Sequence, residues 1–190
     1  MALCKNVHRA YICAQCVHKS VQKLWGDMAY KTVFGSLDNF SKGRIDIIND
    51  DPKHYVFSNL FEVAKKSKPW EKVAVGINQE YVLEAIRAEG QSGWYSCDHD
   101  ETVICMDGNV EVNFVKLDTP VAAAGKSGAV AVNGEPVGKK MGRVVLQQGH
   151  QALLPKGSAY SFTAKKTGVL LQQTIIGDLT KQRWAQICLS

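Results

Sequence analysis

The stretch WYSCDHDETVICMDG, residues 94–108, contains side chains that can bind transition metals. It offers the thiol of Cys97, the imidazole of His99 and the carboxylate of Glu101. His99 and Glu101 are two residues apart, so in an extended strand they share one face. Thiolate, imidazole and carboxylate all bind metals, but Fe(II) is usually held by two His and one carboxylate. The stretch therefore predicts either a metal site of unusual composition or a site that has lost its metal.

Short strands are expected to position this stretch. Segments rich in β-branched and aromatic residues recur along the chain, which is typical of an all-β sandwich or small barrel. They are RIDII (44–48), HYVFS (54–58), FEVA (61–64), KVAVGI (72–77), RVVLQQ (143–148), QALL (151–154), AYSFT (159–163) and GVLLQQTII (168–176). One helix is expected over residues 78–90, because Tyr81 and Ala85, like Val82 and Ile86, lie at helical spacing.

A hairpin is predicted across residues 101–117. The dipeptide Asp107-Gly108 separates two apolar runs and suits a type I′ turn, in which both positions have φ > 0. In the second arm apolar and polar residues alternate from Val110 to Phe114, as they do in a half-buried strand.

Composition and charge restrict the class of protein. The chain has 190 residues, of which 45% are hydrophobic and 22% charged, as in ordinary soluble proteins. Of its net charge of +5, most lies in the first 27 residues, which hold four basic residues against one acidic. The rest is nearly balanced, so nucleic acid is not an expected partner. No apolar run approaches the roughly 18 residues of a membrane span, and membrane contact is not expected either.

The cysteines indicate a cellular compartment. Six cysteines show no regular framework, and the N-terminal residues lack a signal-peptide pattern. Such a sequence indicates that the cysteines are free thiols in a reducing compartment, so a cytoplasmic protein is expected.

Two spacing patterns in the second half of the chain resemble the cupin superfamily. The first family motif ends in Glu and, seven residues later, Gly, which Glu101 and Gly108 match. The second motif begins with Gly, five residues and Pro-x-Gly, which Gly149, Pro155 and Gly157 match. The resemblance implies turns at Gly108, Gly149, Pro155 and Gly157. The resemblance implies an all-β fold: a cupin-type double-stranded β-helix, or jelly-roll barrel, with an N-terminal extension and about one helix before the barrel core.

The resemblance also locates the metal-ligand positions of metal-binding cupins. They fall on Tyr95, Cys97, Glu101 and Tyr160, or on Trp94 and Ser96 for the first two under the longer family spacing. Tyr and Cys thus stand where the family has histidines. Phenolate and thiolate can bind iron or copper, yet we favour a barrel that has lost its metal and fills the space with aromatic side chains. His99 is then a hydrogen-bonded strand residue.

Longer segments look like the small subunit of two-component hydroquinone 1,2-dioxygenases. They are KGRIDIINDDPKHYVFSNLFEVAKKSKPWEKVAVG, EYVLEAIRAEG, WYSCDHDE, MDGNVEVNFVKLD and GHQALLPKGSAYSF. This resemblance implies a non-metal-binding small subunit in a heterotetramer with a large catalytic subunit. The partner subunit holds Fe(II) and cleaves hydroquinone with O2 to 4-hydroxymuconic semialdehyde, an extradiol-type ring cleavage. The isolated chain, with no catalytic residue of its own, is expected to be inactive.

The small aromatic substrate would occupy a site shared by the two subunits. The loop SKPWEK presents Trp70 after Pro69 among charged residues, so Trp70 is a candidate for a substrate lid or interface anchor. The alternative, in which this Trp folds back onto its own barrel, is equally open. Trp94 and Tyr95 are further interface candidates.

Two other functions and one boundary stay open at this stage. The chain could be a stand-alone cupin metalloenzyme that uses His99 and Glu101 with Tyr and Cys ligands, or a non-catalytic binding module. Residues 1–27 are basic and weakly patterned, and Met28 follows them. We therefore expect a disordered extension over 1–27 and a single cupin-like domain over 28–190, with residues 118–142 a mobile surface loop or an added hairpin.

Overall fold

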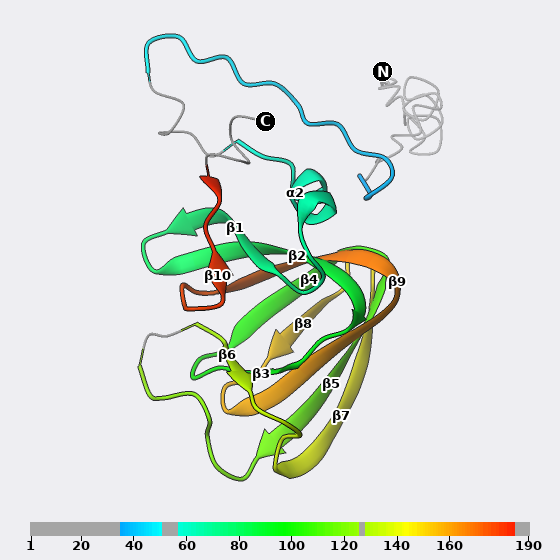
Figure 1. Ribbon diagram of the computed structural model, residues 1–190, viewed down its shortest axis with the longest axis vertical. Coiled ribbons are helices and arrows are strands. Elements are labelled where there is room, and N and C mark those ends of the chain that lie inside the picture. The colour runs from blue at the N-terminus through cyan, green and yellow to red at the C-terminus, as the bar shows by residue number, and fades with distance from the viewer. Residues whose placement is uncertain (1–34, 51–56, 126–127, 185–190) are drawn as a thin grey trace, which may run out of the picture. The chain divides into compact units, whose positions relative to one another are not determined.

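A computed structural model describes residues 35–50, 57–125 and 128–184 (Figure 1). The predicted extension over residues 1–27 lies outside these ranges. The described residues belong to one unit spanning 35–190 and contain one helix and ten strands. These are α2 (Leu60–Lys66), β1 (Lys72–Asn78), β2 (Tyr81–Gln91), β3 (Trp94–Ser96), β4 (Glu101–Asp107), β5 (Asn109–Leu117), β6 (Val130–Val132), β7 (Gly138–Gln147), β8 (Gln151–Leu154), β9 (Ser158–Ile175) and β10 (Thr180–Lys181). No helix among them is long and apolar enough to cross a membrane.

Strand β9 organises the barrel. Its 18 residues pair antiparallel with four other strands: β5 and β3 along its first part, and β4 and β2 along its second. Strands β1 and β10 extend the sheet beyond β2, β6 extends it beyond β3, β8 pairs with β4, and β7 pairs with β5. Figure 1 shows the sheet curling round on itself. This architecture confirms the predicted all-β cupin barrel.

The barrel interior is filled by side chains from every second residue of the strands. In β5, Val110, Val112 and Phe114 are buried, as predicted, and in β4 the buried positions are Glu101, Val103 and Cys105. The main apolar cluster consists of Ile86, Ala88, Val103, Cys105, Val110, Val112, Phe114, Leu146, Leu154, Tyr160, Phe162, Ala164 and Leu170. Within β4, the charged residue Glu101 therefore sits at an inward position.

The helix lies elsewhere than predicted. FEVA was expected to be a strand, but it falls in α2, which Asn59 caps by accepting a hydrogen bond from the Phe61 amide at 2.9 Å. Glu62 and Lys66 form an i,i+4 ion pair at 2.8 Å. These short-range polar contacts outweigh the β-branched character of so short a segment. The helix packs through Val63 on the outer face of the sheet, against Val73 and Ala85.

The helix predicted over residues 78–90 is wrong, because this segment forms the turn after β1 and then strand β2. The helical spacing of its apolar residues has another origin. The middle of β2 is buried on both faces, because the barrel core covers one face and α2 the other: Ile86 lies in the core, while Ala85 packs with Val63 of α2. Gly90, with φ of 73°, lies at a bulge where the pairing with β9 shifts.

The predicted hairpin over residues 101–117 is also wrong in its pairing. Strands β4 and β5 do not pair with each other; both pair with β9, one after the other. Gly108, with φ of 81°, forms the corner between them. A Cβ atom there would lie 2.9 Å from the Gly168 Cα, so close backbone approach, rather than a type I′ turn, explains the glycine.

The remaining differences concern strand boundaries. AYSFT and all of GVLLQQTII except its last residue are parts of the single strand β9, and RIDII contains no strand. Of HYVFS, only residues 57–58 lie within the described part, and they are not in a strand. The described part of segment 118–142 contains β6 and the beginning of β7, which pair with β3 and β5 instead of forming a hairpin of their own.

Candidate functional site

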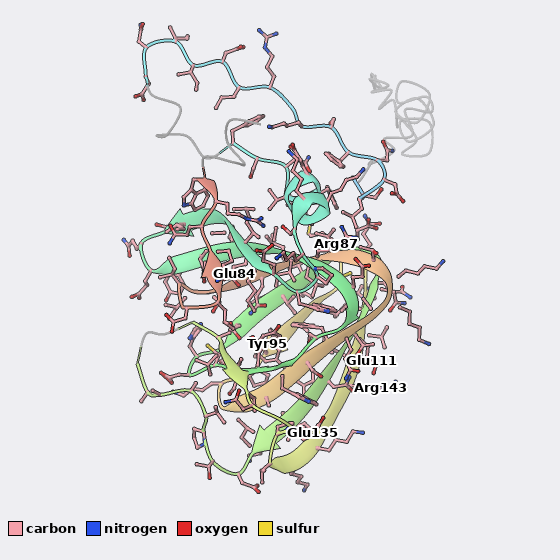
Figure 2. The ribbon with its side chains drawn as sticks, in the orientation of Figure 1. Glu84, Arg87, Tyr95, Glu111, Glu135 and Arg143 are labelled. Carbon is pink, nitrogen blue, oxygen red and sulfur yellow. The ribbon has the colours of Figure 1, made fainter. Side chains whose placement is uncertain are left out.

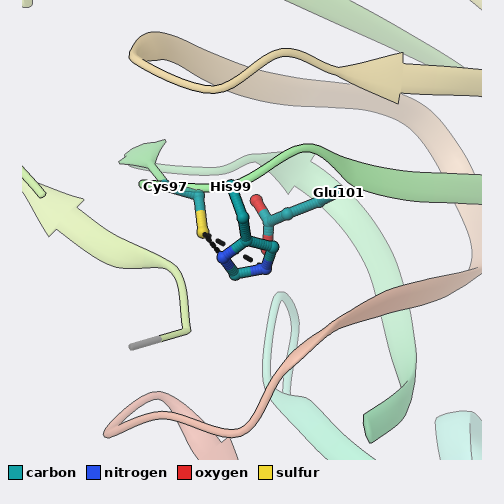
Figure 3. A group of neighbouring side chains, drawn as sticks. All are labelled: Cys97, His99 and Glu101. Carbon is teal, nitrogen blue, oxygen red and sulfur yellow. Dashed lines mark hydrogen bonds between the residues drawn. The ribbon is translucent and has the colours of Figure 1, made fainter. Parts of the chain in front are cut away.

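The cupin ligand positions converge inside the barrel. Cys97 and His99 lie in the segment that connects β3 to β4, so His99 is not the strand residue that was expected, and Glu101 is the first residue of β4. The ligand atoms of the three residues all lie within 4.8 Å of one another (Figure 3). We call these three residues the ligand cluster. Cys97 and Glu101 are buried, and His99 is half-buried. The predicted proximity of His99 to Glu101 is therefore present in the structure.

Tyr160 joins the ligand cluster from β9. Its hydroxyl donates a hydrogen bond to Glu101 Oε2 at 2.5 Å. The other oxygen, Glu101 Oε1, accepts from the amide of Gln172 at 2.8 Å. Tyr160 is completely desolvated and beside a carboxylate, and both effects raise the pKa of its phenol well above the usual value. The phenol is thus held in its neutral, hydrogen-bond-donating form.

His99 is held by hydrogen bonds that define its tautomer. The amide of Ile175 donates to Nε2 at 3.2 Å, so Nε2 is an acceptor and Nδ1 carries the ring N–H. Nδ1 lies 3.1 Å from the sulfur of Cys97. Burial, with the nearby charge of Glu101, raises the pKa of Cys97 to about 11, so the sulfur is a thiol at neutral pH.

A buried cation lies next to the ligand cluster. Lys72, in β1, is only 3% exposed, and its Nζ donates to Gln172 Oε1 at 2.8 Å. It lies 3.8 Å from Glu84 Oε2 and 5.0 Å from the ring centroid of Tyr95. The second oxygen of Glu84 accepts from the Thr180 hydroxyl at 2.7 Å. Burial raises the pKa of Glu84, although Lys72 opposes the shift. Glu84 and Tyr95 are labelled in Figure 2.

Sequence reasoning missed Lys72, Glu84 and Gln172. A signal was available, because each is a polar residue at an inward position of a strand. Glu84 lies between the inward-facing Val82 and Ile86, and Gln172 follows Leu170 by two residues. Buried polar side chains at such positions are uncommon without a partner.

The aromatic candidates lie at different depths. Trp70 stacks on Phe162 with centroids 5.8 Å apart and planes 10° apart, in the folded-back arrangement that the sequence left open. Its φ is 62°, which is unusual for a large side chain, and its buried Nε1 has no hydrogen-bond partner among the described residues. Tyr95 is half-buried against the Tyr160 ring, at 5.9 Å, and Trp94 pairs with Val132 of β6.

The fit of a metal to the ligand cluster can be judged from its hydrogen bonds. Thiolate, imidazole and carboxylate are a reasonable donor set for a borderline metal such as Zn²⁺. Both oxygens of Glu101, however, already accept hydrogen bonds, and Nε2 of His99 accepts one from the backbone. A metal would have to displace these donors and tolerate the ammonium of Lys72. The donor types fit a metal, but the polar surroundings do not.

The second-motif glycines occupy turns, as predicted. Gly149, with φ of 84°, connects β7 to β8. Pro155 and Gly157, the latter with φ of 69°, connect β8 to β9. These turns bring Tyr160, three residues after Gly157, beside Glu101.

Comparisons with known proteins place the chain in a family. No family model matches the sequence, and no curated protein does. Among solved structures, a chain of the hydroquinone 1,2-dioxygenase PnpCD, in complex with Cd²⁺ and 4-hydroxybenzonitrile, is 55% identical, with a TM-score of 0.82. The match covers 87% of this chain and all of that one. A chain of the hydroquinone 1,2-dioxygenase from Sphingomonas sp. TTNP3, with 4-hydroxybenzoate bound, is 52% identical over 83% of this chain and 96% of that one, with a TM-score of 0.80.

A third structure shares the fold alone. It is a chain of PnpCD in complex with Fe³⁺, 11% identical with a TM-score of 0.54. The match covers 73% of this chain but only 39% of that chain, which is therefore much longer. The identities of 52–55% over almost the entire length of the shorter chains show descent as well as fold. This chain belongs to the hydroquinone 1,2-dioxygenase family.

Proposed function

We propose that this chain is the small, non-metal-binding subunit of an Fe(II)-dependent hydroquinone 1,2-dioxygenase, supporting a large catalytic subunit that holds the iron. The observation that carries the proposal is the contrast between two chains of PnpCD. This chain is 55% identical to one of them, over 87% of this chain and all of that one, but it shares only a fold with a longer one. A family enzyme with chains of two lengths supports a heteromer, for which we propose a heterotetramer.

The bound molecules in related structures support the substrate class. They are 4-hydroxybenzonitrile in PnpCD, and 4-hydroxybenzoate and 4-nitrophenol in the Sphingomonas enzyme. Each is a phenol with a para substituent, as is hydroquinone. We propose that the complex cleaves hydroquinone with O2 to 4-hydroxymuconic semialdehyde, an extradiol-type reaction in the cytoplasm.

The role of this chain would be to complete and shield the shared site. Non-haem iron enzymes leave coordination positions open for substrate and O2 and exclude bulk water. Trp70, Trp94 and Tyr95 remain our candidates for contacts with the partner or substrate. The positive φ of Trp70 and its unpaired Nε1 support this assignment, because strain and unsatisfied donors concentrate at functional sites. We propose residues 28–190 as the functional unit.

The proposal can be tested by reconstitution with a family large subunit. Both chains would be produced separately and together, and hydroquinone-dependent O2 uptake and iron content would be measured for each preparation. We expect activity only in the complex, with the iron remaining on the large subunit after the subunits are separated. One iron per chain and full activity in this chain alone would contradict the proposal.

The alternative, a metalloenzyme built on this chain, is favoured by one observation. The ligand atoms of the cluster lie within 4.8 Å of one another. If this alternative holds, the isolated chain binds about one metal ion and loses it when Glu101 is replaced by Ala. The same iron measurement on the isolated chain decides between the two functions.

A further inference from the structure

We propose that the ammonium group of Lys72 takes the place of a metal cation in this barrel, and that removing it converts the ligand cluster into a divalent-metal site. The inference rests on the metal-free part of the proposed function. It adds the group that prevents metal binding, which is the ammonium of Lys72, and the residues that would bind a metal in its absence.

The position of Lys72 supports this role. In β1 it pairs in register with Ile86 of β2, whose side chain is in the barrel core, while its neighbour Val73 faces α2. Its Nζ is therefore inside the barrel. There it contacts three groups: Gln172 Oε1 at 2.8 Å, Glu84 Oε2 at 3.8 Å and the face of the Tyr95 ring at 5.0 Å. An amide oxygen, a carboxylate and an aromatic face are all groups that stabilise a cation.

One side chain connects this cation to the ligand cluster. Gln172 accepts from Lys72 with its oxygen and donates with its nitrogen to Glu101 Oε1 at 2.8 Å. The amide thus bridges the ammonium and the carboxylate. The carboxylates of Glu84 and Glu101 would otherwise be buried together with no cation among the described residues around them. A metal ion performs this neutralisation in a metal-binding cupin, and here an internal lysine does so.

The same charge opposes metal binding. A divalent ion bound to Glu101 would be separated from the ammonium by the amide group of Gln172 alone, in an interior where charge repulsion is weakly screened. It would also have to displace the Gln172 amide and the Tyr160 hydroxyl from Glu101. Replacing Lys72 by an apolar residue of similar length removes the repulsion and leaves a negative site that lacks a cation.

The test is a Co²⁺ titration of the full chain and its Lys72→Met variant, with thiolate-to-Co(II) absorption as the readout. We expect Lys72→Met to bind Co²⁺ at least about 100-fold more tightly than the parent. Cysteines near the N-terminus can also bind Co²⁺, so the signal must be assigned to the barrel. In the Lys72→Met background, Cys97→Ala should abolish the new absorption, whereas Cys105→Ala should retain it. Cys105 is an equally buried thiol on β4 that is not in the cluster.

Loss of folding would not block the test. If Lys72→Met is unfolded without metal, refolding on addition of Co²⁺, followed by circular dichroism, supports the proposal. The double variant Lys72→Met/Glu84→Gln offers a second route, because it removes one negative charge together with the positive one. The proposal fails if neither variant gains Cys97-dependent binding. Cys97-dependent Co²⁺ binding by the parent chain would overturn both this inference and the proposal that the subunit binds no metal. If the parent chain and the variants all lack such binding, only this inference fails and the proposed function stands.

Discussion

The hydroxyl of Tyr160 lies 2.5 Å from a carboxylate oxygen of Glu101, and neither side chain is more than 1% exposed. Tyr160→Phe removes this donor and leaves a buried carboxylate oxygen with one hydrogen bond fewer. We expect the free energy of unfolding to fall by about 1–3 kcal/mol. Urea denaturation followed by tryptophan fluorescence would measure the change.

Tyr95→Phe is the matched control for this substitution. The hydroxyl of Tyr95 makes no hydrogen bond to any residue that the structure describes, and its ring packs against that of Tyr160. The same chemical change at Tyr95 should alter the free energy of unfolding by less than about 0.5 kcal/mol. Equal losses for the two variants would show that the Tyr160–Glu101 hydrogen bond contributes little.

The buried thiol of Cys105 makes the free energy of unfolding depend on pH in the alkaline range. Burial raises the pKa of its thiol from 9.0 to about 11. In the unfolded chain the thiol ionises near pH 9, while the folded protein retains the proton. The stabilisation is therefore complete below pH 9 and is lost as the pH rises from 9 to 11. Cys105→Ala should flatten the fall of unfolding free energy in this window by up to about 1.4 kcal/mol per pH unit.

The control for this prediction is the same comparison at lower pH. Between pH 6 and 8 the thiol is protonated in both states, so the difference between parent and Cys105→Ala should stay constant. A parallel decline of the two proteins between pH 9 and 11 would contradict the assignment of the raised pKa to Cys105.

Substitutions at Gly108 and Gly90 distinguish two effects of replacing a glycine by alanine: backbone strain and steric contact of the added Cβ atom. Both have positive φ, of 81° and 73°, so Ala at either position costs about 1–2 kcal/mol of backbone strain. At Gly108 the added Cβ would also lie 2.9 Å from a backbone atom of Gly168, whereas nothing lies within 4 Å at Gly90. Gly108→Ala should therefore reduce the free energy of unfolding by about 1–3 kcal/mol more than Gly90→Ala. Similar losses in thermal unfolding would mean that the corner relaxes.

Trp70 offers a test of the shared substrate site. In the reconstituted complex we expect Trp70→Ala to raise the KM for hydroquinone about tenfold, equivalent to about 1.4 kcal/mol of binding energy. Trp70→Phe retains an aromatic ring that can stack on Phe162, so it separates packing from indole contacts. Unchanged turnover and KM in Trp70→Ala, with the complex intact by gel filtration, would remove Trp70 from the site.

The barrel was predictable from the sequence because its signals are local. Gly149 and the Pro155–Gly157 turn have the predicted positions, and the inward alternation of β5 was visible as Val110, Val112 and Phe114. The errors arose where one pattern fits two structures. The middle of β2 is buried on both faces, which produces apolar residues at helical spacing.

The candidate site was only half predictable for a similar reason. Spacing identified Cys97, Glu101 and Tyr160, because the motif fixes their separation along the chain. Motif spacing did not indicate that Lys72 and Gln172 contact each other, because they are 100 residues apart and meet only when β1 and β9 flank β2. Contacts between distant strands depend on topology, which a single sequence specifies weakly.

The position of β9 has a consequence for biosynthesis. This strand begins at residue 158 and is the neighbour of β2, β3, β4 and β5, all of which precede it in the chain. As the ribosome makes the protein, these earlier strands have no central partner until the last fifth of the sequence has emerged. The nascent chain therefore completes its fold late, through pairings between strands that are far apart in the sequence.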